Sequence, residues 1–203
     1  MNYDKLILEL FSRVQILEEQ VAEVNKELAD LREEDADDEF EEEIEGQGGY
    51  TRSEAREKAM EIIQDKFPDY LVNKASRKDG SGITAHRPNE SKPRIIKFYH
   101  SRTFKHSSGK YEHGWHVVRL DDVIGTIVDY CILSMVDSND NWYFFIFNPE
   151  ELGRYKEKHR SRSGSVLHLY FSVQDGRAFE VREDTVDVTE HLNNWDVLDI
   201  SEA

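Results

Sequence analysis

Apolar residues recur through the first 31 residues of the chain, alternating four and three positions apart without interruption. The repeat consists of Tyr3, Ile7, Leu10, Val14, Leu17, Val21, Val24, Leu28 and Leu31. β-Branched residues at position a, with mostly leucine at position d, favour a parallel two-stranded coiled coil. A helix packed on its own domain would show a wider apolar stripe with a period of 3.6 residues. The pattern therefore predicts that residues 1–32 form a parallel coiled-coil dimer, in which the apolar positions from Ile7 to Leu31 make the dimer contacts.

An acidic segment follows this predicted coiled coil. Residues 33–45 hold ten acids and no base, and residues 46–49 are Gly-Gln-Gly-Gly. Like charges repel and extend such a segment, and it has too few apolar residues to form a core. We expect residues 33–49 to be a flexible acidic linker. This linker carries most of the formal net charge of −16, so the rest of the chain is close to neutral.

From residue 50 onward, short apolar stretches separated by turn residues predict one α+β domain, residues 50–203, with a mixed or antiparallel sheet. Thr51 and Glu54 have the spacing of a capping box, and Pro68 ends the helix that follows. We expect strands at residues 70–75, 82–86, 94–104, 115–120, 128–136, 142–147, 166–173 and 177–181. A short helix is expected at Pro149 and a closing helix at residues 189–198.

The segment from Lys92 to Arg119 is basic and rich in histidine and aromatic residues. It contains seven Lys and Arg residues against one acid, together with four histidines and five aromatic residues. Cations interleaved with aromatic side chains suit phosphate contacts and base stacking. The residues expected to contact DNA or RNA are Lys97, Tyr99, Arg102, Lys105 and Lys110. The domain as a whole is not basic, so an acidic surface of another protein is an open alternative partner.

The sequence favours neither a metal nor a cofactor. His113 and His116 are separated by Gly114, and residues three apart on a strand point to opposite faces. The single cysteine, Cys131, lies in an apolar run, as a buried small residue would. No signal peptide or bilayer-spanning apolar run is present, so we expect a cytoplasmic protein without membrane contact.

In the order of its elements from Ile83 onward, the chain resembles the restriction-endonuclease-like (PD-(D/E)xK) superfamily. The resemblance rests on residues 81–84 (SGIT), residues 94–102 (RIIKFYHSR), a strand beginning at Trp115, residues 129–133 (DYCIL), residues 142–152 (WYFFIFNPEEL) and a helix at Trp195. It implies a nuclease-like scaffold built on a mixed sheet.

Active members of that superfamily present an acid where Thr84 stands and a Glu-x-Lys on the next strand. Here Lys97 and Tyr99 take the latter positions, or Ile95 and Lys97 if the register shifts by two. Metal-dependent phosphodiester hydrolysis needs clustered carboxylates, so the resemblance implies a scaffold without catalytic residues. Asp79 is close enough in sequence to act as a displaced ligand, which keeps an active metal-dependent nuclease as an alternative.

These patterns together predict a homodimeric, non-catalytic binding protein. Two degenerate nuclease-like domains on one coiled coil would gain avidity for a repeated or extended partner. A further alternative is a protein-interaction adaptor, encoded by a phage or mobile element, that acts on host defence.

Overall fold

The computed structural model describes residues 50–76, 82–90, 92–105, 112–158, 165–182 and 185–199. The chain divides into two units, residues 1–48 and 49–203, and all the described residues belong to the second unit. The predicted coiled-coil contacts and the acidic linker therefore lie outside the described residues.

The described residues form an α+β fold, as the sequence predicts. Helix α2 spans Arg52–Lys66 and helix α3 spans Pro149–Lys158. The described strands are β1 (Leu71–Lys74), β2 (Ile83–His86), β3 (Arg94–Lys105), β4 (Glu112–Arg119), β5 (Tyr130–Val136), β6 (Trp142–Phe147), β7 (Val166–Gln174), β8 (Arg177–Glu180) and β9 (Val186–Asp187). Short 3-10 helices occur at η2 (Leu120–Asp122), η3 (Thr189–His191) and η4 (Trp195–Leu198).

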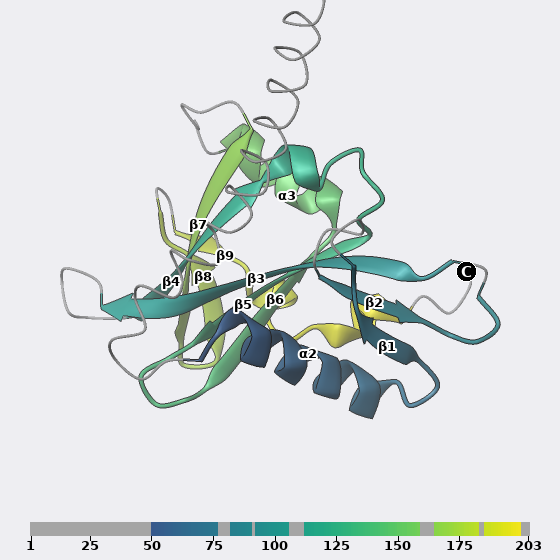
Figure 1. Ribbon diagram of the computed structural model, residues 1–203. Helices are drawn as coiled ribbons and strands as arrows, with labels where there is room; N and C mark the ends of the chain where they lie inside the picture. Colours follow the sequence, from purple (N-terminus) through teal and green to yellow (C-terminus); the bar gives the residue numbers. More distant parts are fainter. Residues whose placement is uncertain are drawn as a thin grey trace, which may run out of the picture. The chain divides into compact units, whose positions relative to one another are not determined.

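Strand β3 joins two groups of strands, because its two ends pair with different neighbours. Residues 96–102 run parallel to β5, whose other edge pairs antiparallel with β6. The start of β3 pairs antiparallel with β2, and β2 pairs with β1. The last three residues of β3 pair with β4, and the sheet continues through β7, β8 and β9. In Figure 1, β3 crosses the molecule between β1 and β2 on one side and β4, β7 and β8 on the other.

Two apolar cores lie on opposite faces of β3, because successive side chains of a strand alternate between faces. Ile96 and Phe98 belong to the core beneath α2 and η4, which also contains Ala59, Ile63 and Trp195. The second core lies between β5 and β6 on one side and β4, β7 and α3 on the other. Its fully buried members include Val118, Leu133, Phe145, Phe147, Leu152, Leu169 and Phe171.

Several predicted helix ends and turns are confirmed. The Thr51 side chain accepts a hydrogen bond from the backbone N–H of Glu54, and the Glu54 carboxylate accepts one from the backbone N–H of Thr51. The helix ends at Lys66, two residues before Pro68. Strands β7 and β8 form the predicted hairpin, with Asp175 and Gly176 at φ values of 50° and 75° in its turn. Such positive φ values are typical of a two-residue hairpin loop.

The predicted closing helix over residues 189–198 is wrong, because the backbone there divides into η3 and η4. Asn193 adopts a positive φ of 51°, which interrupts a helix. Its backbone N–H donates to the Phe144 carbonyl at 2.7 Å, and its Oδ1 accepts from the Phe144 N–H at 3.0 Å. The edge of β6 thus gains partners that a continuous helix would not supply.

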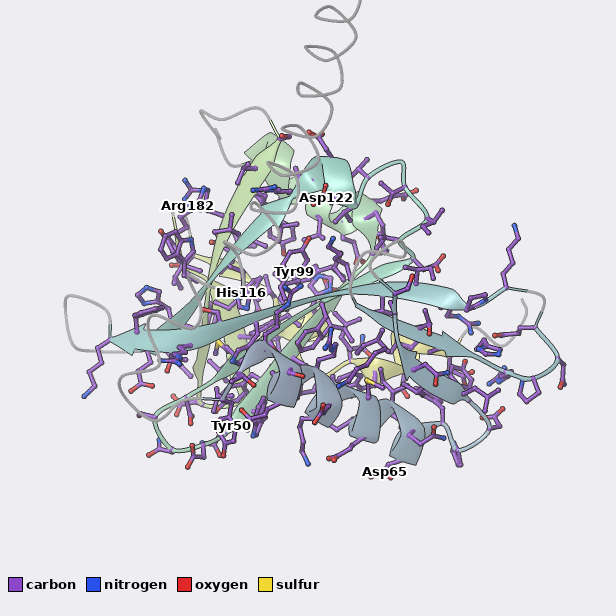
Figure 2. The ribbon with its side chains drawn as sticks, in the orientation of Figure 1. Tyr50, Asp65, Tyr99, His116, Asp122 and Arg182 are labelled. Carbon is purple, nitrogen blue, oxygen red and sulfur yellow. The ribbon has the colours of Figure 1, made fainter. Side chains whose placement is uncertain are left out.

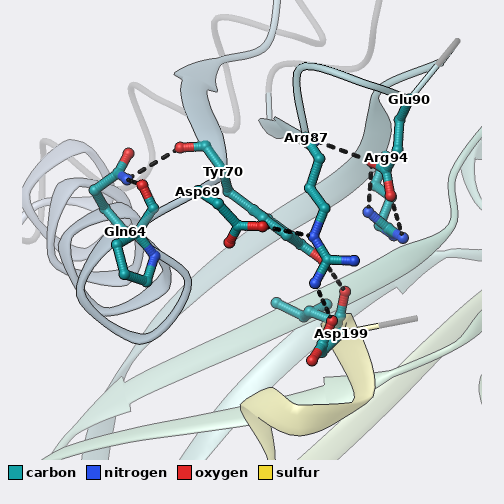
Figure 3. Close-up of polar contacts among 9 residues, drawn as sticks. Gln64, Asp69, Tyr70, Arg87, Glu90, Arg94 and Asp199 are labelled. Carbon is teal, nitrogen blue, oxygen red and sulfur yellow. Dashed lines mark hydrogen bonds and ion pairs between the residues drawn. The ribbon is translucent and has the colours of Figure 1, made fainter. Parts of the chain in front are cut away.

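An arginine network ties the loop after β2 to the end of the described chain (Figure 3). Arg87 donates from Nε to Asp69 at 2.9 Å and from Nη2 to Asp199 at 2.5 Å. Its guanidinium also lies 5.0 Å from the centre of the Tyr70 ring. The Tyr70 hydroxyl in turn donates to the Leu198 carbonyl at 3.2 Å. These contacts hold η4 against the core that contains Ile96 and Phe98.

Candidate nucleic-acid interface

The structure does not place the predicted nucleic-acid contacts on one surface. Tyr99 packs against the second core, and Lys97, on the same face of β3, is partly buried with its Nζ 4.0 Å from the Asp122 carboxylate. Lys105 is exposed at the end of β3, on the same alternating face as Lys97. Lys110 lies outside the described residues.

Arg102 lies on the other face of β3, which continues onto the outside of β4 and β7. By strand alternation Arg102 shares this face with Phe98 and Phe104. Phe104 pairs directly with His113 of β4, so the two side chains lie on one face. The same face of β4 then carries Trp115 and its neighbours at alternate positions, while the intervening residues are buried.

Among the described residues, five rings form a continuous row on this outer face, and we call them the ring row. In spatial order they are Phe104, His113, Tyr170, Trp115 and His168. The successive ring centroids are 6.4, 5.4, 6.1 and 5.9 Å apart. The row results from strand register, because Trp115 pairs with Tyr170 and the next outward position, Val117, pairs with His168.

The ring row is open to solvent at its large apolar members. Phe104 is 44% exposed and Trp115 is 43% exposed, and Val117, which lies beside the row on the same face of β4, is also 43% exposed. Aromatic side chains normally contribute much of their surface to a core or an interface. A group of exposed apolar side chains on adjacent strands marks an interaction surface.

Trp115 is held in place between Tyr170 and His168. Its indole Nε1–H donates to His168 Nδ1 at 3.1 Å, and the two rings are 27° from parallel with centroids 5.9 Å apart. Partial burial and the nearby Arg182 guanidinium lower the pKa of His168, which favours the neutral ring that can accept this bond. Arg182 donates from Nη1 to the His168 carbonyl at 3.2 Å and lies at the margin of the molecule in Figure 2.

Arginines border the ring row. Arg102 precedes Phe104 by two residues on the same face of β3. Arg119 is exposed near the other end of β4, on the same face as Trp115. With Arg182, these side chains place positive charge around a largely apolar surface.

The remaining β4 histidine lies inside the fold (Figure 2). His116 is buried and donates from Nε2 to the Ser134 carbonyl at 2.9 Å, and burial lowers its pKa to about 4. His113 and His116 therefore face opposite sides of the strand, as the sequence predicts. Among the described residues, no three His, Cys, Asp or Glu side chains are grouped to hold a metal ion. Cys131 is buried as predicted, and burial raises the pKa of its thiol to about 12.

The positions that carry the nuclease resemblance lie within the sheet. Thr84 of β2 pairs with Ile95 of β3 and donates from Oγ1 to the Asn73 carbonyl at 3.4 Å. Lys97 pairs with Cys131 of the parallel strand β5. Asp79 lies outside the described residues.

Sequence reasoning missed Tyr170, His168 and Val117 as members of the outer surface. Residues 166–171 (VLHLYF) do alternate, with His168 and Tyr170 between the buried residues Leu167, Leu169 and Phe171. This alternation could have assigned them to the outer face of a strand. The pairing of β7 with β4, which brings them beside Trp115, comes from the fold.

A scan against protein-family models finds no match, and searches of curated proteins and of solved structures find no significant match. The interpretation of this surface therefore rests on its own residues. Within the described part of the chain, no helix is long and apolar enough to cross a membrane.

Proposed function

We propose that this chain is a homodimeric, non-catalytic protein that binds nucleic acid through the ring row. The observation that carries the proposal is the exposure of Trp115 between Tyr170 and His168 in a row of rings on an open sheet face. Stacking of one nucleobase on an aromatic side chain contributes about 1–3 kcal/mol.

The arginines around the row favour nucleic acid over an acidic protein. Arg102 and Arg119 are placed for phosphate contacts on either side of the rings, which themselves suit bases. An acidic protein surface would use the cations and leave Trp115 and Phe104 without a matching partner. Rings and cations together match a ligand with both planar groups and phosphates.

The non-catalytic part of the proposal rests on the residues at the nuclease-like positions. Thr84, Lys97 and Tyr99 supply no carboxylate there, and a lysine would repel a divalent cation. The dimeric part rests on the heptad pattern of residues 1–32. Two domains joined through residues 33–49 would bind an extended strand more tightly than one domain, because the second contact is intramolecular.

The test is a fluorescence-anisotropy titration of the full chain with labelled oligonucleotides of mixed sequence. Trp115→Ala should weaken binding about 5- to 150-fold, the loss of about 1–3 kcal/mol of stacking. Leu71→Ala is the matched control, because Leu71 is 50% exposed but lies on β1, outside the ring row. Equal affinities of the Trp115→Ala variant and the unmodified chain would contradict the proposal.

A nuclease assay separates the catalytic alternative. We expect the full chain to leave the same oligonucleotides intact in the presence of Mg²⁺ or Mn²⁺. Cleavage that disappears in Asp79→Ala would instead establish an active enzyme with a displaced metal ligand.

A further inference from the structure

We infer that the ligand of the ring row is single-stranded RNA or DNA, with unpaired bases stacked on Trp115 and its neighbouring rings. This inference rests on the proposed function and names the class of nucleic acid. It follows from three properties of the surface: the kind of contact it offers, the small number of cations among its described residues, and its rigidity.

The first property is that the surface offers ring contacts on a sheet rather than an element that could enter a groove. Trp115, Tyr170 and Phe104 lie on three neighbouring strands, β4, β7 and β3. In a duplex the base faces are stacked on one another, and proteins read the base edges with a helix or ribbon placed in a groove. The faces of bases become available when a strand is unpaired, as in the recognition of RNA loops by aromatic residues on a sheet.

The second property is the small number of cations in the part of this surface that the structure describes. In the described part of the surface, the arginines beside the rings are Arg102, Arg119 and Arg182. A protein that makes about 6–10 phosphate contacts loses affinity steeply as the salt concentration rises. With roughly two or three phosphate contacts, a single strand should show a slope of log K against log salt of about −2. Stacking must then provide a large part of the binding free energy.

The third property is that the rings are already held in position. The indole of Trp115 is fixed by its bond to His168 Nδ1, and Tyr170 contacts His113 edge-on at an interplanar angle of 78°. The strands below them pair over six residues of β4. A preorganised surface loses little conformational entropy when a ligand binds.

The length of the row limits how many bases can stack. It crosses from β3 through β4 to β7, which is roughly 10 Å between the outer strands at about 4.8 Å per neighbouring pair, and it also extends along β4 and β7 from His113 to His168. This length suits two or three bases, as on other sheet surfaces that bind RNA.

The experiment compares three probes of equal length with the full chain: a mixed-sequence 12-nucleotide single strand, the duplex of the same sequence, and an abasic strand with the same phosphates. We expect the single strand to bind at least tenfold more tightly than either of the others, with a salt slope of about −2. Trp115→Phe, which keeps a ring, should retain most of the affinity, whereas Trp115→Ala should lose most of the preference for bases.

Two results would overturn the inference, and they differ in what they say about the proposed function. Equal binding of single strand, duplex and abasic strand would show that phosphates alone are recognised, so nucleic-acid binding would stand but its single-strand class would not. Absence of binding to all three probes would overturn both. Circular dichroism of both Trp115 variants confirms that the sheet is intact, which is expected because Trp115 lies at the surface.

Discussion

Mild acid should destabilise this domain through a histidine that the fold buries. His116 is 2% exposed, and its Nε2 donates to the Ser134 carbonyl. Its other ring nitrogen, Nδ1, has no hydrogen-bond partner among the described residues. A proton added at Nδ1 would place an uncompensated charge in the core, which is why burial lowers the pKa of His116 from 6.5 to about 4.

The sign and size of the effect follow from this pKa. Between pH 6.5 and about 4 the unfolded chain binds a proton at this histidine and the folded chain does not. The contribution of neutral His116 to the free energy of unfolding therefore has its full value above pH 6.5. It is lost as the pH falls from 6.5 toward 4. Through this one histidine, lowering the pH from 6 to 5 should reduce the free energy of unfolding by about 1 kcal/mol. His100 should change the stability in the same direction, because burial also lowers its pKa to about 4. Its side chain is less completely buried than that of His116.

Urea unfolding at pH 7, 6 and 5 measures this loss. His116→Gln removes the titrating group while its amide N–H can still donate to the Ser134 carbonyl. The variant should be less stable than the unmodified chain at pH 7. As the pH is lowered, however, its free energy of unfolding should decrease less steeply, by about 1 kcal/mol per pH unit. Ile63→Val, in the core beneath α2, is the control, and we expect a loss of about 1 kcal/mol at every pH.

The chosen pH range separates this effect from that of the carboxylates. Hydrogen bonds from Thr51 lower the pKa of Glu54, and bonds from Ser138 and Thr103 lower that of Glu112, so both stay ionised above pH 5. Equal pH slopes for His116→Gln and the unmodified chain would refute the reasoning.

Two further substitutions test the packing of the fold by urea unfolding at neutral pH. Gly82→Ala should destabilise the domain by more than about 2 kcal/mol, because its Cβ would lie 1.9 Å from the Ile96 carbonyl oxygen of the neighbouring strand; a loss below about 0.5 kcal/mol would disprove this close approach. Thr51→Ala should cost about 1 kcal/mol, because it removes the side chain that caps α2. Unchanged stability would mean that the cap contributes nothing in the folded chain.

Local sequence signals predicted most of the elements, because those signals act over a few residues. The capping pair of Thr51 and Glu54 sets the start of α2, and Asp175 with Gly176 sets the hairpin between β7 and β8. The closing helix failed for a non-local reason. Asn193 makes two hydrogen bonds to the backbone of Phe144, 49 residues earlier. No local pattern reveals that these backbone groups at the edge of β6 need hydrogen-bond partners.

The candidate site was less predictable than the fold for a similar reason. A basic segment rich in rings was evident, but strand alternation sends Lys97 and Tyr99 to one face of β3 and Arg102 to the other. The rings that do gather come partly from this basic segment and partly from β7, so that Trp115 contacts His168, which lies 53 residues later. Their contact depends on the register of β4 with β7, which a single sequence does not supply.

The most direct test of the nucleic-acid surface uses the three tryptophans of the chain. Trp115 is exposed in the ring row, Trp142 lies beside Tyr50, and Trp195 is buried beneath β6. Their indole N–H signals can be followed by NMR while an unlabelled single-stranded oligonucleotide is added to the full chain, with Trp115→Phe assigning its signal. We predict a saturable shift of the Trp115 signal with the Trp195 signal unmoved. A Trp115 signal that stays in place while the oligonucleotide binds would contradict the account.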